Sequence, residues 1–195
     1  MRTMVTNGLH AIALSYRLVG GSRQLTRARV AALQRLALPV HTGPRRDESL
    51  ELRGWLDAHL RQLDHRVAAA ADGDPGARPL LTHPGVGAVT ALPTVLVLGP
   101  VRRCPGSKEV ASYVGWAPTL HASADTRHLG PITKQGNARL RMVLVQAASS
   151  AARYDEDLKR LYLPLLRRRG HAKARVAGAR KLLVRLFIML RDRID

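Results

Sequence analysis

A serine and several basic residues lie close together in the stretch from Tyr113 to Ala148, and these residue types suit chemistry on a phosphate. The apolar segment Tyr113–Pro118 leads into a polar segment, Thr119–Pro131, which we expect to be a loop with Ser123 near its centre. The next residues turn into a basic helix that begins near Asn137 and runs to about Ala152. Backbone N–H groups at a helix N-terminus attract anions, so this order of segments predicts a phosphate site.

The candidate contacts to nucleic acid in this stretch are a lysine, two residues of the turn and two arginines: Lys134, Gly136, Asn137, Arg139 and Arg141. A second interpretation assigns Gly136 and Asn137 to the backbone, because Asn is a favoured residue at the start of a helix. That interpretation leaves Lys134 and Arg141 to contact phosphate. The two interpretations are compatible.

Two further glycines, Gly85 and Gly87, lie in a predicted turn between a short helix over 78–82 and a second helix over 88–98. This pattern resembles a helix-hairpin-helix motif, in which glycine lets the backbone approach a phosphate. A purely structural turn explains the same pattern equally well. We expect His83 to be a residue of this turn and not a metal ligand.

The formal net charge of +18 and the pI of about 11.6 predict a polyanionic partner, with nucleic acid first. A membrane surface is the competing partner, but no segment approaches a spanning length, so we expect no membrane association. Cys104 is the only cysteine, which excludes a disulfide framework and a thiolate zinc site. We expect a cytoplasmic protein with no cofactor of its own.

Leu, Val and Ala must build the core because aromatic residues make up only 4% of the chain, and this favours a mainly α fold. Leucines at spacings of three and four predict a helix over 48–71 that begins after Asp47, with an apolar stripe that suits a core face or a coiled-coil seam. The break at 72–76 divides the chain into a helical arm, 1–72, and a compact helical domain, 73–195.

Four features occur in an order and spacing that resemble a known family: Leu81–Gly87, Tyr113–Pro118, Ser123, and Ile132–Asn137 leading to Leu140 and Arg141. The chain is similar to the C-terminal transposase domain of the insertion-sequence transposases with a DEDD nuclease domain, the IS-one-hundred-ten type guided by a bridge RNA. The similarity is clearest from Leu80 to Ala152. Two departures follow the serine, since Ala124 stands where the family has glycine and Asp125 adds a negative charge.

This resemblance implies that Ser123 is the catalytic residue, attacking a DNA phosphodiester to form a transient phosphoserine link. It also implies DNA as the partner, a structured guide RNA and a homo-oligomer. In that family a preceding nuclease domain holds Mg²⁺ with four carboxylates. Here the first acidic residue is Asp47, so we expect the nuclease domain to be absent. We therefore expect Mg²⁺ to bind only together with that missing domain, and the chain alone to be inactive.

A non-catalytic nucleic-acid-binding module, using the turn at Gly85 and the basic helices, is the alternative function. From Arg139 to the end, 15 Lys and Arg stand against 5 Asp and Glu, and Arg167–Arg169 is the densest run. Such a surface suits a nucleic-acid backbone. We expect the acidic cluster Asp155–Asp157 to be a solvated helix start. A serine nucleophile distinguishes the transposase from the pure binder.

Overall fold

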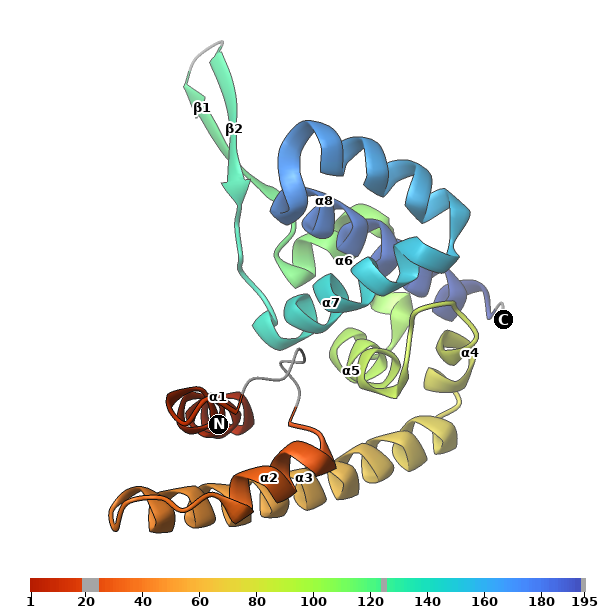
Figure 1. Cartoon of the computed structure of the whole chain (residues 1–195). Helices are drawn as coiled ribbons and strands as arrows, with labels where there is room; N and C mark the ends of the chain where they lie inside the picture. The colour runs from red at the N-terminus through yellow and green to blue at the C-terminus, as the bar shows by residue number, and fades with distance from the viewer. Residues whose placement is uncertain (19–24, 124–125, 194–195) are drawn as a thin grey trace. The chain divides into compact units, whose positions relative to one another are not determined.

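The computed structural model describes residues 1–18, 25–123 and 126–193, and these residues form helices and one two-stranded antiparallel sheet (Figure 1). The predicted mainly α fold is confirmed. The chain divides into two compact units, Met1–His65 and Arg66–Asp195. The units meet inside one long helix, whereas the sequence placed a domain boundary after Asp72, close to the end of that helix.

The N-terminal unit is built from α1 (Arg2–Ser15), α2 (Arg27–Arg35) and the first part of α3 (Thr42–Gly73). Its small core joins buried leucines and an alanine from α1, α2 and the segment before α2: Leu9, Ala13, Leu25 and Leu33. Leu50 of α3 packs against this core. These helices therefore form a cluster with a small core of its own.

Arg46 fixes the connection between α2 and α3. Its Nη1 donates to the carbonyl oxygens of Leu33 and Leu36 at 2.9 and 3.0 Å, near the end of α2. Its Nε donates to Asp47 at 2.8 Å, and this hydrogen bond holds the pKa of Asp47 below its usual value. The prediction that Asp47 starts the helix was wrong, because α3 begins at Thr42 and accommodates Pro44 in its first turn, where a proline costs no helical hydrogen bond.

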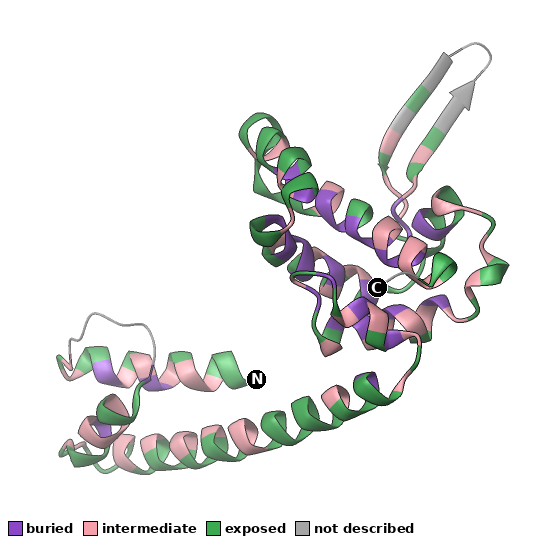
Figure 2. Ribbon diagram, turned by 90° about the vertical axis from the view of Figure 1, so that its right-hand side faces the viewer, coloured by how far each residue is buried: buried purple, intermediate pink, exposed green. Residues whose placement is uncertain are grey.

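The apolar stripe of α3 is not a core face in this chain. Leu52, Trp55, Leu60 and Leu63 are between 41% and 57% exposed, and most of the helix is drawn as exposed or intermediate in Figure 2. The face that carries Leu50 is the one that meets the N-terminal core. Spacing alone predicted the stripe correctly but did not determine what covers it.

The C-terminal unit contains the remaining elements: α4 (Ala77–Leu81), α5 (Ala88–Leu98), the 3-10 turn η1 (Val101–Arg103), α6 (Ser107–Val114), β1 (Pro118–Ser123), β2 (Thr126–Ile132), α7 (Ala138–Tyr154) and α8 (Glu156–Asp192). The predicted helix over 88–98 matches α5.

The core of this unit is dominated by the packing of α7 against α8. Small residues allow the close approach: a Cβ on Gly178 of α8 would lie 3.5 Å from the Cβ of Ala148 and 3.3 Å from Tyr162. Gly170, with φ of +79° and ψ of 173°, breaks α8 into two helical halves that fold back on each other (Figure 1).

The segment predicted as a polar loop, Thr119–Pro131, is instead a β-hairpin that projects from the helices of its unit (Figure 1). Leu120 pairs with Leu129, His121 with His128 and Ser123 with Thr126. Polar and apolar residue types alternate in Thr119–Ser123, as in a strand, but not in Thr126–His128, so the sequence pattern did not mark the second strand. Ala124 and Asp125 lie outside the described residues.

Two glycines hold the approach to α7 against the end of α6. Gly115, with φ of +87°, ends α6, and a Cβ there would lie 1.8 Å from the carbonyl oxygen of Gln135. Gly136, with φ of +109°, would bring a Cβ to 2.2 Å from the oxygen of Tyr113. The backbone N–H of Lys134 donates to Gly115 at 3.1 Å. No other residue type fits this contact without moving the backbone.

We therefore expect Gly115→Ala to destabilise the protein by more than about 2 kcal/mol, because it adds both a clash and a strained φ. Gly87→Ala is the matched control, since its φ of −108° is ordinary and no atom lies within 4 Å of the added Cβ. Thermal and urea unfolding of both variants measure the difference. Equal stability of the two variants would contradict the close contact.

Candidate nucleic-acid interface

The N-terminus of α7 is capped by Asn137. Its side-chain oxygen accepts the backbone N–H of Leu140 at 3.0 Å, and its carbonyl accepts that of Arg141 at 3.2 Å. The interpretation of Gly136 and Asn137 as residues that shape and start the helix is therefore confirmed. Both residues are also exposed, so the same turn remains open to an anion.

Lys134 and Arg139 are the exposed cations on either side of this cap. Lys134 adopts a φ of +57°, which is uncommon for a residue with a side chain and is held by its backbone hydrogen bond to Gly115. No hydrogen bond or ion pair of either side chain is formed within the described part of the chain. Two free cations beside a helix N-terminus present a positive surface.

Arg141 has a structural task that the sequence did not reveal. Its side chain is partly buried, and Nη1 donates to the carbonyl oxygen of Val114 at 2.8 Å, near the C-terminal end of α6. The guanidinium satisfies a carbonyl that the helix leaves unpaired. Arg141 thus ties α7 to α6, and fewer of its donors remain for a ligand.

Gly85 and Gly87 have different surroundings. At Gly85, with φ of +83°, a Cβ would lie 2.5 Å from the backbone of Ala151 in α7, so this glycine is required for packing the α4–α5 turn. Gly87 precedes α5, is exposed and has open space around it. Of the two, Gly87 has the more exposed backbone. The turn and both flanking helices appear as predicted.

Ser123 is the last residue of β1, at the outer end of the described hairpin. Its side chain lies outside the described residues, so its proximity to Lys134 and Arg141 stays a prediction. His128 on the facing strand is exposed. Because this segment is a hairpin and not a loop, the pairing of its two strands supports the residues near its outer end.

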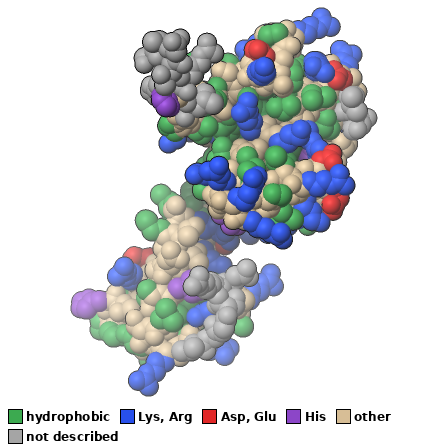
Figure 3. Space-filling model, turned by 90° about the horizontal axis from the view of Figure 1, so that it is seen from above, with side chains coloured by type: hydrophobic (Ala, Val, Ile, Leu, Met, Phe, Trp, Pro, Cys, Tyr) green, Lys and Arg blue, Asp and Glu red, His purple; other side chains and the backbone are tan. Residues whose placement is uncertain are grey.

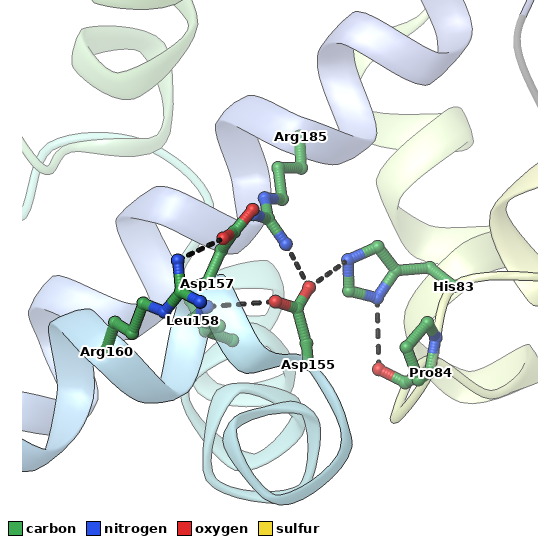
Figure 4. Close-up of polar contacts among 7 residues, drawn as sticks. All are labelled: His83, Pro84, Asp155, Asp157, Leu158, Arg160 and Arg185. Carbon is green, nitrogen blue, oxygen red and sulfur yellow. Dashed lines mark hydrogen bonds and ion pairs between the residues drawn. The ribbon is translucent and has the colours of Figure 1, made fainter.

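A buried polar network joins the α4–α5 turn to the junction of α7 and α8 (Figure 4). Asp155 accepts the backbone N–H of Leu158 at 2.9 Å and so caps α8. The same carboxylate pairs with Arg185 Nη1 and lies 3.4 Å from Nε2 of His83, whose Nδ1 is 3.0 Å from the Pro84 oxygen. Arg185 Nη2 also bonds Asp157 at 2.8 Å.

This network corrects the prediction of a solvated acidic cluster at Asp155–Asp157. The side chain of Asp155 is only 10% exposed, whereas that of Asp157 is 67% exposed. His83 is buried in the turn, consistent with the role predicted for it. The cap position of Asp155 was readable from the sequence, but Arg185 lies 30 residues further on, and no local pattern connects the two.

Part of the chain is similar to known proteins. Residues 77–163 match the family described as Transposase IS116/IS110/IS902. The chain contains a transposase domain of this family. The matched span of the transposase domain runs from α4 into the first half of α8, and it includes the α4–α5 turn, the hairpin and all of α7.

Three relatives illustrate the similarity. The transposase for insertion sequence element IS1111A of Coxiella burnetii is 30% identical over 129 residues, covering 64% of this chain and 35% of that protein. An uncharacterized 43.6 kDa protein of insertion element IS110 from Streptomyces coelicolor is 31% identical, covering 68% and 33%. The pilin gene-inverting protein of Moraxella lacunata is 29% identical, covering 87% and 53%. The chain thus spans about a third to a half of their length.

Lys and Arg side chains are spread over the visible face of the unit that carries the transposase domain, and acidic side chains are few on it (Figure 3). Some cations of this unit are paired within the chain: Lys159 pairs with Glu156 at 3.0 Å and Arg160 with Asp157 at 3.8 Å. The total of 32 Lys and Arg therefore overstates the number of cations available to a partner.

Among the described residues, no group of three or more His, Cys, Asp or Glu side chains is placed to hold a metal ion. The described residues of the transposase domain therefore do not fit a Mg²⁺ site by themselves. In the same part of the chain, no helix combines the length and apolarity needed to cross a membrane.

Asp155→Asn is expected to destabilise the transposase domain by about 2–4 kcal/mol, because it leaves Arg185 and His83 without their buried carboxylate. Asp157→Asn, which removes an exposed partner of the same arginine, should cost below about 1 kcal/mol. Urea unfolding near neutral pH measures both. A larger loss for Asp157→Asn would show that the burial of Asp155 does not matter.

Proposed function

We propose that this chain acts in DNA transposition or recombination, as a DNA-binding transposase domain whose Ser123 attacks a DNA phosphodiester. The family match over 77–163 carries the proposal, because the matched span includes Ser123 and the basic start of α7. The relatives' names describe transposition and pilin gene inversion, which are both rearrangements of DNA.

In the proposed reaction, Oγ of Ser123 forms a bond to phosphorus while the bond from phosphorus to a deoxyribose oxygen breaks. The serine proton passes to a base, and the leaving oxygen takes up a proton. A serine hydroxyl is a weak nucleophile unless its proton is accepted. Positive charge must also surround the phosphate as negative charge develops. Lys134 and Arg139 lie beyond the base of the hairpin, at the start of α7, and are exposed cations that suit contacts to the nucleic-acid backbone there.

Activation of the serine is assigned to a carboxylate nuclease domain that binds Mg²⁺, as the family resemblance implies. The described residues offer no cluster of acidic side chains to replace it. We propose DNA as the partner, together with a structured guide RNA, and a homo-oligomer as the working assembly. The helical turn at Gly87 and the start of α7 then contact the nucleic-acid backbone.

For DNA binding, we expect Arg139→Ala to weaken affinity a few-fold and to lower the slope of log K against log salt by about 0.9, the value of one phosphate contact. Gln146→Ala, an exposed uncharged change on the same helix, is the matched control and should leave both unchanged. Arg141→Ala should weaken binding too and also cost about 1 kcal/mol of stability, because the Val114 carbonyl loses its donor. Fluorescence anisotropy with a labelled duplex measures the slopes. Salt-independent binding by the unaltered chain would refute the proposal.

For catalysis, the chain alone should cleave no DNA, and the nuclease domain of a relative with Mg²⁺ should enable a covalent protein–DNA adduct. Ser123→Ala should abolish the adduct without weakening binding, since it removes only the nucleophile. Ser149→Ala is the control, because that serine lies within α7, with its Oγ 3.5 Å from the Val145 carbonyl oxygen. Denaturing gels with end-labelled DNA detect the adduct. An adduct that persists in Ser123→Ala would assign the nucleophile elsewhere and favour the non-catalytic binding module.

A further inference from the structure

The sharp corner of α8 carries a group of exposed cations that form no hydrogen bond or ion pair within the described residues. We call Arg167, Arg168, Arg169 and Lys173 the corner patch; they flank Gly170, where the helix reverses, and all four are exposed. No atom lies within 4 Å of a Cβ built on Gly170, so nothing in the described chain covers the corner.

The corner patch differs from the cations at the start of α8. Lys159 and Arg160 each form an ion pair with a carboxylate of the chain, as does Arg185 in the second half of the helix. No carboxylate of the described residues pairs with the corner patch. Cations near a helix C-terminus interact favourably with the helix dipole, but this interaction stabilises them only modestly. A run of adjacent arginines repels itself, and an external polyanion relieves that repulsion.

A surface hollow connects the corner patch to the base of the hairpin. This hollow, of about 710 Å³, has Lys173, Arg180 and Lys181 among its lining residues on α8, and Trp116 and Ile132 at the root of the hairpin. Its remaining lining is aliphatic, from residues such as Val176 and Val184. The positive surface therefore continues from the corner towards the hairpin that carries Ser123.

From this arrangement we infer that the corner patch and the cations of the hollow bind the phosphate backbone of the nucleic acid on which the hairpin acts. This inference rests on the proposed function and adds a second contact surface, distinct from the start of α7. The aliphatic lining offers few hydrogen-bonding groups to base edges, so the contact positions the nucleic acid without reading its sequence.

The test compares three forms of the full chain: unaltered, Arg167→Gln/Arg168→Gln/Arg169→Gln, and the control Lys159→Gln/Arg160→Gln, whose cations are already paired. Two labelled duplexes of unrelated sequence are titrated by fluorescence anisotropy at about 50 to 200 mM salt. The corner variant should lower the salt slope by about two to three, from about 0.9 per phosphate contact, and equally for both duplexes. The control Lys159→Gln/Arg160→Gln should lower the salt slope much less for each charge removed. Lys173→Gln/Arg180→Gln/Lys181→Gln should also lower the slope, because the surface is continuous.

Circular dichroism of the corner variant should match that of the unaltered chain, because the substituted side chains are exposed. An unchanged slope in the corner variant, or an equal fall per charge in the control, overturns the inference alone. Loss of binding to vesicles of phosphatidylserine with unchanged DNA binding overturns it in favour of a membrane surface. If the unaltered chain binds neither duplex at low salt, the proposed function fails and the inference fails with it.

Discussion

The contact on which the C-terminal unit most depends is the buried carboxylate of Asp155. It caps the start of α8, pairs with Arg185 in the second half of the same helix, and lies beside His83 in the α4–α5 turn. Three segments distant in sequence thereby meet at one charge. A buried carboxylate is tolerated only when such partners surround it, so the fold-back of α8 and the position of the turn are coupled.

Close backbone contacts complete this framework. Gly85 lets the α4–α5 turn rest on Ala151 of α7, while Gly115 and Gly136 bring the end of α6 against the segment that leads into α7. Each contact is possible because a side chain is missing. The exposed turn around Lys134 is therefore held by packing on its inner side, which is what a rigid contact to a phosphate requires.

The cations of this chain fall into two groups, those that form contacts within the fold and those that stay exposed. Arg46, Arg141 and Arg185 bind carbonyl oxygens or carboxylates and hold the fold together. Lys134, Arg139 and the corner patch are exposed and form no such contacts within the described residues. The excess of positive charge thus belongs to the surface, where it raises affinity for a polyanion at the cost of self-repulsion.

The sequence by itself determined the mainly α fold, the helix from Ala88 to Leu98 and the helix start at Asn137. These features follow from local periodicity, capping and glycine, which act within a few residues. It also indicated the family through the order of short motifs. The prediction of a loop at Thr119–Pro131 was wrong, because strand pairing joins two segments and only the first of them alternates polar and apolar residues. Only the tertiary structure decided which charges are paired: Asp155 meets Arg185 and His83, and Arg141 meets Val114, through contacts between distant segments that no local pattern encodes.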